Sequence, residues 1–254
     1  MRPYDTHITD HGFMENPLEH FELHPLIPLS LFGIDISINK AVVMMWIASG
    51  LVFLFFSVAT KRRSLVPRRV QNLAEMAVEF LRALVVENMG PLGHKFFPFI
   101  ATLFFFVLFA NLLGLIPGAY TVTSQLMVTG FFALVVYGLS LVVGFALHGL
   151  HFLTILAPAG TPGWLLPLMV PIEIISQLAR PVTLAVRLFA NMTAGHIILI
   201  VLFSLMMTAP VYIGWMPFGF TVAIYGLELF VAFIQAYIFT ILACVYLGDA
   251  VKLH

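Results

Sequence analysis

Long apolar runs, separated by short polar or turn-forming segments, dominate the pattern of this 254-residue chain. Several runs reach the roughly 20 residues that a helix needs to cross the hydrocarbon core of a bilayer. The pattern therefore predicts an all-α polytopic membrane protein with five transmembrane helices. We expect the spans at about residues 40–60, 96–116, 126–150, 165–209 and 217–250.

The chain divides into a leader and one membrane domain. Residues 1–39 form an N-terminal leader, and residues 40–254 form a single integral membrane domain without internal repeats. A basic cluster follows the first span and consists of Lys61, Arg62, Arg63, Arg68 and Arg69. Because cytoplasmic loops are enriched in lysine and arginine, this cluster predicts an external leader and, after five spans, a cytoplasmic C-terminus.

Residues 70–89 have a different pattern from the spans. Glu75, Glu79 and Arg82 recur at helical spacing, and apolar residues mark another side. This pattern is typical of an amphipathic helix that lies in the membrane interface. A helix packed on a neighbour would have the same pattern, so the sequence leaves both placements open.

The later connections and spans carry two further expectations. A short uncharged turn joins the second and third spans and predicts a tight hairpin, and the turn formers of 151–164 predict a loop. The last two stretches are too long for a membrane, since about 40 helical residues extend roughly 60 Å against a core of about 30 Å. They must tilt strongly, break, or both, and Pro167, Pro171 and Pro181 offer break points.

Composition narrows the class of protein. Apolar residues make up 61% of the chain and charged residues 9%. The single cysteine, Cys244, excludes a disulfide framework and a thiolate metal cluster. A formal net charge of zero argues against a nucleic-acid partner. No phosphate-binding loop is present, and we expect neither a metal nor another cofactor.

A line of polar groups follows one face of the predicted helix 165–209. Steps of four, three, seven and four residues keep its members within a narrow arc at about 100° per residue. The line consists of Glu173, Gln177, Arg180, Arg187 and Asn191. A charge at membrane depth costs roughly 2.5–3.5 kcal/mol, so Arg187 in particular is a functional candidate.

A second polar line follows the predicted helix 217–250. It consists of Thr221, Glu228, Gln235 and Tyr246. His196 lies off the first line and is expected to face a different environment. Such lines face a bundle interior, an aqueous path or another subunit, and hydrogen-bonded packing between helices is the alternative. Two arginines and two glutamates exceed what packing needs, so we favour an ion path.

Several motifs together resemble subunit a of F-type ATP synthases, called subunit 6 in mitochondria. The run from Arg187 to His196 (Arg-Leu-Phe-Ala-Asn-Met-Thr-Ala-Gly-His) resembles the family's signature. Further likeness lies in Pro17–Glu22, Asn111–Pro117 and Gln235–Thr240, so that the resemblance covers nearly the whole chain.

The resemblance implies a stator subunit of the membrane Fo sector, which is not catalytic alone. Such a subunit provides two proton half-channels and couples proton flow to rotation of the c-subunit ring and to ATP synthesis. The implied partners are the c ring, the peripheral-stalk b subunits, other ATP synthase subunits and membrane lipid. The implied location is a bacterial inner membrane, with the mitochondrial inner membrane as the alternative.

The resemblance also assigns roles to residues. Arg187 matches the family's essential arginine, which attracts each ring carboxylate and blocks a direct proton leak. A guanidinium stays protonated at physiological pH and lowers the pKa of a carboxylate within about 4–6 Å, so it drives deprotonation without relaying protons. His196, Glu228 and Gln235 match the external half-channel. Glu173 matches the half-channel on the cytoplasmic side.

Other positions complete the candidate site. Asn191 belongs to the signature and is assigned to proton translocation, while Asn111 and Arg180 are candidate path residues. A cap at the end of its own span is the alternative for Asn111. Many bacterial members carry an acid at the position of His196 and a histidine at that of Glu228. This chain therefore has the exchanged, mitochondrial-type arrangement.

Two other classes of protein fit parts of the pattern. A self-contained proton-coupled transporter would also carry charges near the midplane, but such folds usually contain paired internal repeats, which this sequence lacks. A membrane redox enzyme would need paired histidines or cysteines as cofactor ligands, and their absence weighs against it.

Overall fold

The computed structural model describes residues 25–27, 30–31, 34–35, 38–61, 69–116, 122–156, 164–208, 210 and 215–252. Most of the predicted leader and most of the basic cluster behind the predicted orientation lie outside these residues. Within them, four short strands precede the first helix: β1 Pro25–Ile27, β2 Ser30–Leu31, β3 Ile34–Asp35 and β4 Ile38–Asn39. They pair antiparallel, β1 with β4 and β2 with β3.

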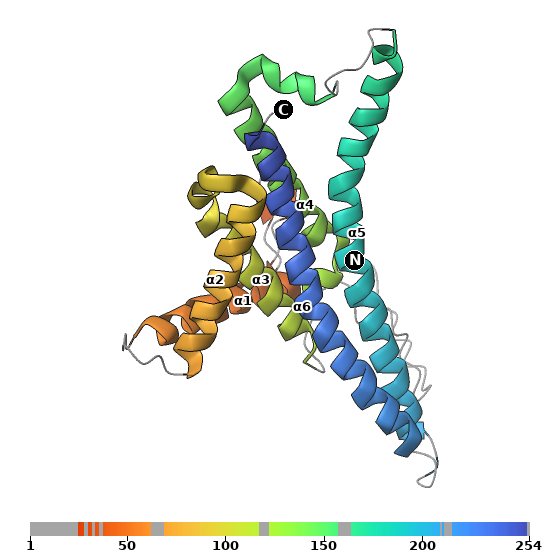
Figure 1. Ribbon diagram of the computed structural model, residues 1–254. Coiled ribbons are helices and arrows are strands. Elements are labelled where there is room, and N and C mark those ends of the chain that lie inside the picture. Colours follow the sequence, from red (N-terminus) through yellow and green to blue (C-terminus); the bar gives the residue numbers. More distant parts are fainter. Residues whose placement is uncertain are drawn as a thin grey trace.

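Helices form nearly all of the rest of the described chain (Figure 1). The α-helices are α1 Lys40–Thr60, α2 Arg69–Met89, α3 Phe97–Gly114, α4 Leu126–His148, α5 Leu166–Thr208 and α6 Trp215–Val251. The 3-10 helices are η2 Gly90–Lys95, η3 Val122–Ser124 and η4 Gly149–Leu156. Five of the described helices, all except α2, are long and apolar enough to cross a membrane, which confirms the predicted class.

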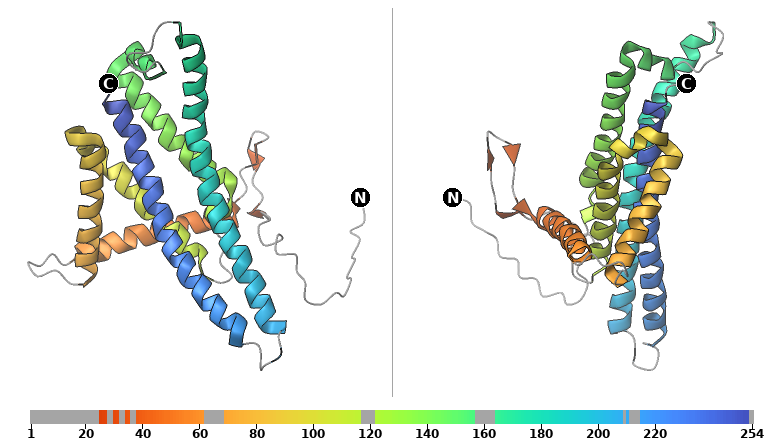
Figure 2. Two further views of the ribbon diagram at one scale, coloured as in Figure 1. Left: turned by 45° about the vertical axis from the view of Figure 1, so that its right-hand side comes forward. Right: turned by 60° about the vertical axis from the view of Figure 1, so that its left-hand side comes forward.

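The relative directions of the helices support the predicted tilt. α1 has 21 residues and extends about 31 Å, which matches the hydrocarbon core. α5 and α6 have 43 and 37 residues and extend about 65 and 55 Å. Figure 2 shows α1, in orange, running across the direction of α5 and α6. An α1 that crosses the core directly therefore leaves α5 and α6 strongly inclined in the membrane.

α5 is one continuous helix, so the breaks expected at its prolines do not occur. Pro171 and Pro181 both lie inside it, and Pro167 lies in its first turn. A proline removes one backbone hydrogen bond, and neighbouring helices make its presence tolerable within a membrane span. Pro181 is buried against such neighbours. The helix therefore keeps its full length without interruption.

The core is centred on α6, against which α2, α3, α4 and α5 all pack. Ala232, Ala236 and Ala243 of α6 are fully buried, and small residues of this kind let helix backbones approach closely in a membrane protein. α3 and α4 each pack more extensively on α6 than on one another. The expected tight hairpin is thus splayed, although the rings of Phe106 and Phe132 still meet at 5.1 Å.

The end of α4 differs from the expected loop. Gly149 has a φ of 56°, a conformation that favours glycine, and it ends the helix. The chain then continues as η4, which occupies the first part of the predicted loop. Phe152 of η4 packs directly over Gly144 of α4 and edge-on against Phe145 at 5.1 Å. η4 is thereby folded back onto α4.

α2 is packed on its neighbours, which is one of the two placements that its sequence left open. Leu81, Leu84 and Val85 are buried, and the helix packs along α6. Leu73 and Phe80 are exposed apolar residues on its outer side, as an interfacial helix requires. α2 is therefore a packed helix that also offers an apolar surface.

Candidate functional site

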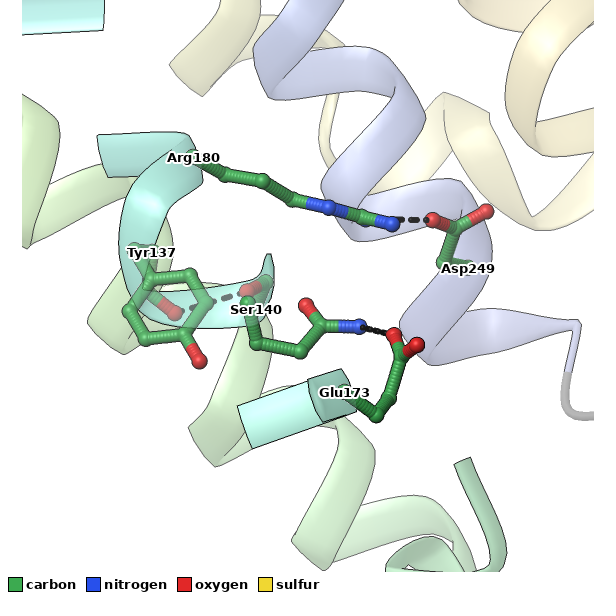
Figure 3. Close-up of polar contacts among 6 residues, drawn as sticks. Tyr137, Ser140, Glu173, Arg180 and Asp249 are labelled. Carbon is green, nitrogen blue, oxygen red and sulfur yellow. Dashed lines mark hydrogen bonds and ion pairs between the residues drawn. The ribbon is translucent and has the colours of Figure 1, made fainter. Parts of the chain in front are cut away.

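The first part of the polar line of α5 forms a paired cluster with the end of α6. Arg180 Nη1 lies 3.3 Å from Asp249 Oδ2, in an ion pair that joins the two helices. One turn earlier, Gln177 Nε2 donates a hydrogen bond of 2.9 Å to Glu173 Oε1. Figure 3 shows both interactions beside Tyr137 and Ser140 of α4. The carboxylate groups of this cluster are thus both partnered.

A cavity of about 210 Å³ adjoins this cluster and lies between α4, α5, α6 and η4. Its polar lining consists of Tyr137, Ser140, Gln177, Arg180, Tyr246 and Asp249, and the rest of the lining is apolar. The Arg180 guanidinium lies over the Tyr246 ring, 5.7 Å from the ring centre. Space beside several polar groups suits ordered water.

Glu228 has contrasting surroundings. It is half-buried on α6, and its Oε1 atom is buried without a hydrogen-bond partner among the described residues. The carboxylate lies directly against Gly195 of α5, where a Cβ atom would come within 2.9 Å of Glu228 Cδ. His196, the next residue, is also half-buried. The packing of α5 on α6 therefore brings Glu228 to the backbone beside His196.

Arg187 and Asn191 lie between these two places on α5 and are exposed. Leu184 and Leu188, on the neighbouring side of the helix, are buried in the core. Within the described part of the chain, no ion pair involves Arg187. The predicted polar face is thus divided: its first three members are half-buried beside the cavity, and its last two are exposed.

Two further candidates, Asn111 of α3 and Gln235 of α6, lie where α3 packs on α6. Asn111 of α3 is fully buried and donates a hydrogen bond of 3.3 Å from Nδ2 to the Ala232 backbone oxygen. Its Oδ1 atom has no partner among the described residues. Ala232 follows Glu228 by one turn and precedes Gln235, which is also buried. Asn111 therefore bonds to another helix, and this overturns the alternative of a cap on its own span.

Sequence reasoning missed Asp249, Tyr137 and Ser140. Asp249 could have been found from the sequence, because it is an acidic residue inside the predicted last span, three residues after Tyr246. No pattern marked Tyr137 and Ser140, since single hydroxyls are common in apolar helices. Among the described residues, no group of three or more His, Cys, Asp or Glu side chains could hold a metal ion.

Comparison with known proteins gives the chain its family. The sequence profile described as "ATP synthase A chain" matches residues 42–248. The chain belongs to the ATP synthase A chain family. A protein named ATP synthase subunit a from Magnetococcus marinus is 49% identical over 243 residues, which cover 94% of each chain. Another of that name from Rhodospirillum rubrum is 43% identical over 241 residues, covering 95% of this chain and all of the relative.

Membership in the ATP synthase A chain family confirms the resemblance found in the sequence. The chain is a membrane-embedded, proton-translocating stator component of the Fo sector and is not catalytic alone. Its five long apolar helices agree with an integral membrane protein.

Proposed function

We propose that Arg187 faces the ring of c subunits and that two half-channels meet the ring on either side of it. In this proposal, protons enter on the external side through His196, Glu228 and Gln235, with Asn111 and Asn191 along the path. They leave past Glu173 and Arg180 toward the cytoplasm. Proton flow then turns the c ring and is coupled to ATP synthesis in the assembled complex.

The exposure of Arg187 is the observation that carries this proposal. A guanidinium on the outside of an apolar helix, without an ion pair in the described residues, needs a partner that these residues do not supply. A carboxylate on a neighbouring subunit suits a guanidinium by charge and hydrogen-bond geometry. Each ring carboxylate would lose its proton beside Arg187 and regain one after the ring turns away.

The separation of the other polar groups supports two distinct paths. Glu173 precedes Arg187 by 14 residues, or about 21 Å along the helix. It accepts a hydrogen bond from Gln177, which lines the cavity between α4, α5, α6 and η4. Gly195 follows Arg187 by eight residues, or about 12 Å along the helix. The Glu228 carboxylate of α6 packs against Gly195. Arg187 thus lies between two places where a proton could be held, as a barrier requires.

The exchanged histidine and acid are the most specific part of the proposal. His196 on α5 and Glu228 on α6 would form the relay pair in the mitochondrial-type order. A histidine has an ordinary pKa near 6.5 and can both accept and release a proton near neutral pH. The c ring, the b subunits and a bacterial inner membrane, with an external N-terminus and a cytoplasmic C-terminus, complete the proposed setting.

Proton pumping by an Arg187→Ala variant tests the function. Inverted vesicles that hold the assembled complex would be compared for ATP-driven pumping and for passive proton leak. We expect pumping to be lost and the leak to rise, because both the attraction of the ring carboxylate and the barrier are removed. Arg187→Lys should restore pumping poorly, since a desolvated ammonium can lose its proton.

Val186→Ala is the matched control for this test. Val186 is exposed beside Arg187 but carries no charge, so its truncation should leave pumping close to that of the unaltered complex. Normal pumping by Arg187→Ala in an assembled complex would overturn the proposed role.

A further inference from the structure

The Arg180–Asp249 ion pair joins two helices at positions 69 apart in sequence. Arg180 and Asp249 are 34% and 48% exposed, and both line the cavity. An exposed pair of this kind contributes little to stability. Stability alone is therefore a weak reason for two charges in membrane helices.

The choice of partner is fixed by the packing of α5 on α6. Glu173 lies on the same face as Arg180 but seven residues away, which is about 10.5 Å along the helix, and its Oε1 accepts from Gln177. Lys252 follows Asp249 by three residues, yet its Nζ donates to the Asn88 backbone oxygen at 2.9 Å. Asp249 and Arg180 therefore pair with each other, because Glu173 and Lys252 have other partners.

The pair has a consequence for the charge on the polar face of α5. Arg180 and Arg187 are seven residues apart, on the same face, and so are about 10.5 Å apart along the axis. Both guanidinium groups stay charged at physiological pH. With Arg180 held by Asp249, Arg187 is the arginine on this face that lacks an ion pair within the described residues.

We infer that Asp249 is a positioning residue that holds Arg180 toward α6 and neutralises it, so that a single uncompensated guanidinium faces the rotor. This inference rests on the proposed function of Arg187. A second free guanidinium on the same face would attract a carboxylate that has already left Arg187. The carboxylate would stay ionised for longer and regain its proton later, and each step of rotation would slow.

Three variants of the assembled complex test the inference through ATP-driven proton pumping in inverted vesicles. Asp249→Asn frees Arg180 and should slow pumping by about fivefold, which corresponds to about 1 kcal/mol. Arg180→Gln should slow pumping less, because it adds no free cation to the polar face. Arg180→Gln with Asp249→Asn should pump faster than Asp249→Asn alone, because the freed cation is then absent.

The rescue separates charge control from simple packing. If the pair only holds α5 and α6 together, the double variant should pump no better than Asp249→Asn, and this result would overturn the inference. Unchanged pumping by Asp249→Asn would overturn it as well. Should Asp249→Asn fail to assemble, a double variant that assembles and pumps supports the inference, and one that also fails to assemble refutes it.

Two controls in the same vesicles complete the design. Glu79→Gln removes an exposed carboxylate from α2, away from the polar face, and should leave pumping unchanged. Arg187→Ala reports on the proposed function itself. Loss of pumping in Arg187→Ala together with normal pumping in Asp249→Asn would refute the role of Asp249 and leave the proposed function intact. Normal pumping in Arg187→Ala would refute the proposed function.

Discussion

α6 carries two carboxylates whose surroundings differ in almost every respect. Asp249 is 48% exposed, lies at the margin of a cavity and pairs with a guanidinium at 3.3 Å. Glu228 is half-buried, lies against a glycine of α5 and has a buried oxygen without a hydrogen-bond partner in the described residues. Two acids on one helix are thus suited to different tasks by what the neighbouring helices place beside them.

The difference has a physical meaning. A buried polar atom without a partner costs about 1–3 kcal/mol, and such atoms need an explanation where they occur in a native fold. A role in taking up and releasing a proton would explain why Glu228 keeps a buried oxygen without a partner among the described residues. Asp249 offers its charge to one fixed partner and is suited to holding that partner in place.

Filling the space beside Glu228 should have a large effect on pumping. A Cβ atom at Gly195 would overlap the end of the Glu228 side chain, which is flexible and can move aside. We therefore expect Gly195→Ala to allow assembly but to lower ATP-driven pumping by about tenfold, equivalent to about 1.4 kcal/mol, because the carboxylate is displaced. Gly226→Ala on α6, where a Cβ atom meets nothing within 4 Å, is the control. Equal pumping by the two variants would contradict a role for the Glu228 position.

The cavity beside Asp249 can be altered by moving Phe152, which lines it and packs on Gly144. A Cβ atom at Gly144 would lie 2.6 Å from Phe152 Cδ2, so the ring of η4 must shift. Gly144→Ala should destabilise the chain by about 1–3 kcal/mol, as overpacking does. The midpoint of thermal unfolding in detergent measures this loss.

Gly138→Ala on the same helix provides the matched comparison. Its Cβ atom would meet nothing within 4 Å, so alanine should raise the unfolding midpoint through a gain of about 0.5–1 kcal/mol in helix stability. A fall in midpoint for Gly138→Ala as large as that for Gly144→Ala would show that η4 packing is not the cause.

Neutralising each acid should change stability in opposite directions. Glu228→Gln removes a poorly compensated charge and should raise the unfolding midpoint while abolishing pumping, because an amide cannot carry the proton. Asp249→Asn removes a partnered charge and should lower the midpoint by the equivalent of up to about 1 kcal/mol. Changes of the same sign in both variants would remove the contrast between the two sites.

The smallest expected effect concerns the end of α6. Lys252 Nζ donates to the Asn88 backbone oxygen and so joins the last residues of α6 to the end of α2. Lys252→Met keeps the length of the side chain and removes this bond, for an expected loss of about 0.5–1 kcal/mol in unfolding free energy. Pumping should fall slightly, if the position of Asp249 depends on this attachment. A midpoint identical to that of the unaltered chain would show that the bond contributes nothing.

The helices themselves follow closely from the sequence. α1 has the predicted bounds, Lys40–Thr60, because an apolar run of that length between polar flanks leaves a helix little choice of register in a bilayer. The long stretches became the continuous helices α5 and α6, because a helix satisfies the backbone groups of an apolar segment internally. The prolines of α5 were read as break points, but a proline breaks a helix only when its surroundings leave the freed groups unsatisfied.

The candidate site was predictable in part. Periodicity along a single helix identified the polar line of α5, with Arg187 and Glu173 among its members, because residues at helical spacing share a face whatever surrounds them. The partners on other helices were not predictable in this way. Asn111 reaches Ala232 across 121 residues, and Arg180 reaches Asp249 across 69.

The sequence by itself determined the helical class, the five apolar spans and the faces on which polar residues gather, since hydrophobicity and helical periodicity are local properties of the chain. Only the tertiary structure decided which of those polar residues are paired and which are exposed. The same line of α5 contains Arg180, held by Asp249, and Arg187, which has no ion pair in the described residues. That distinction depends on how α4 and α6 pack across α5, and packing between distant segments cannot be deduced from one helix alone.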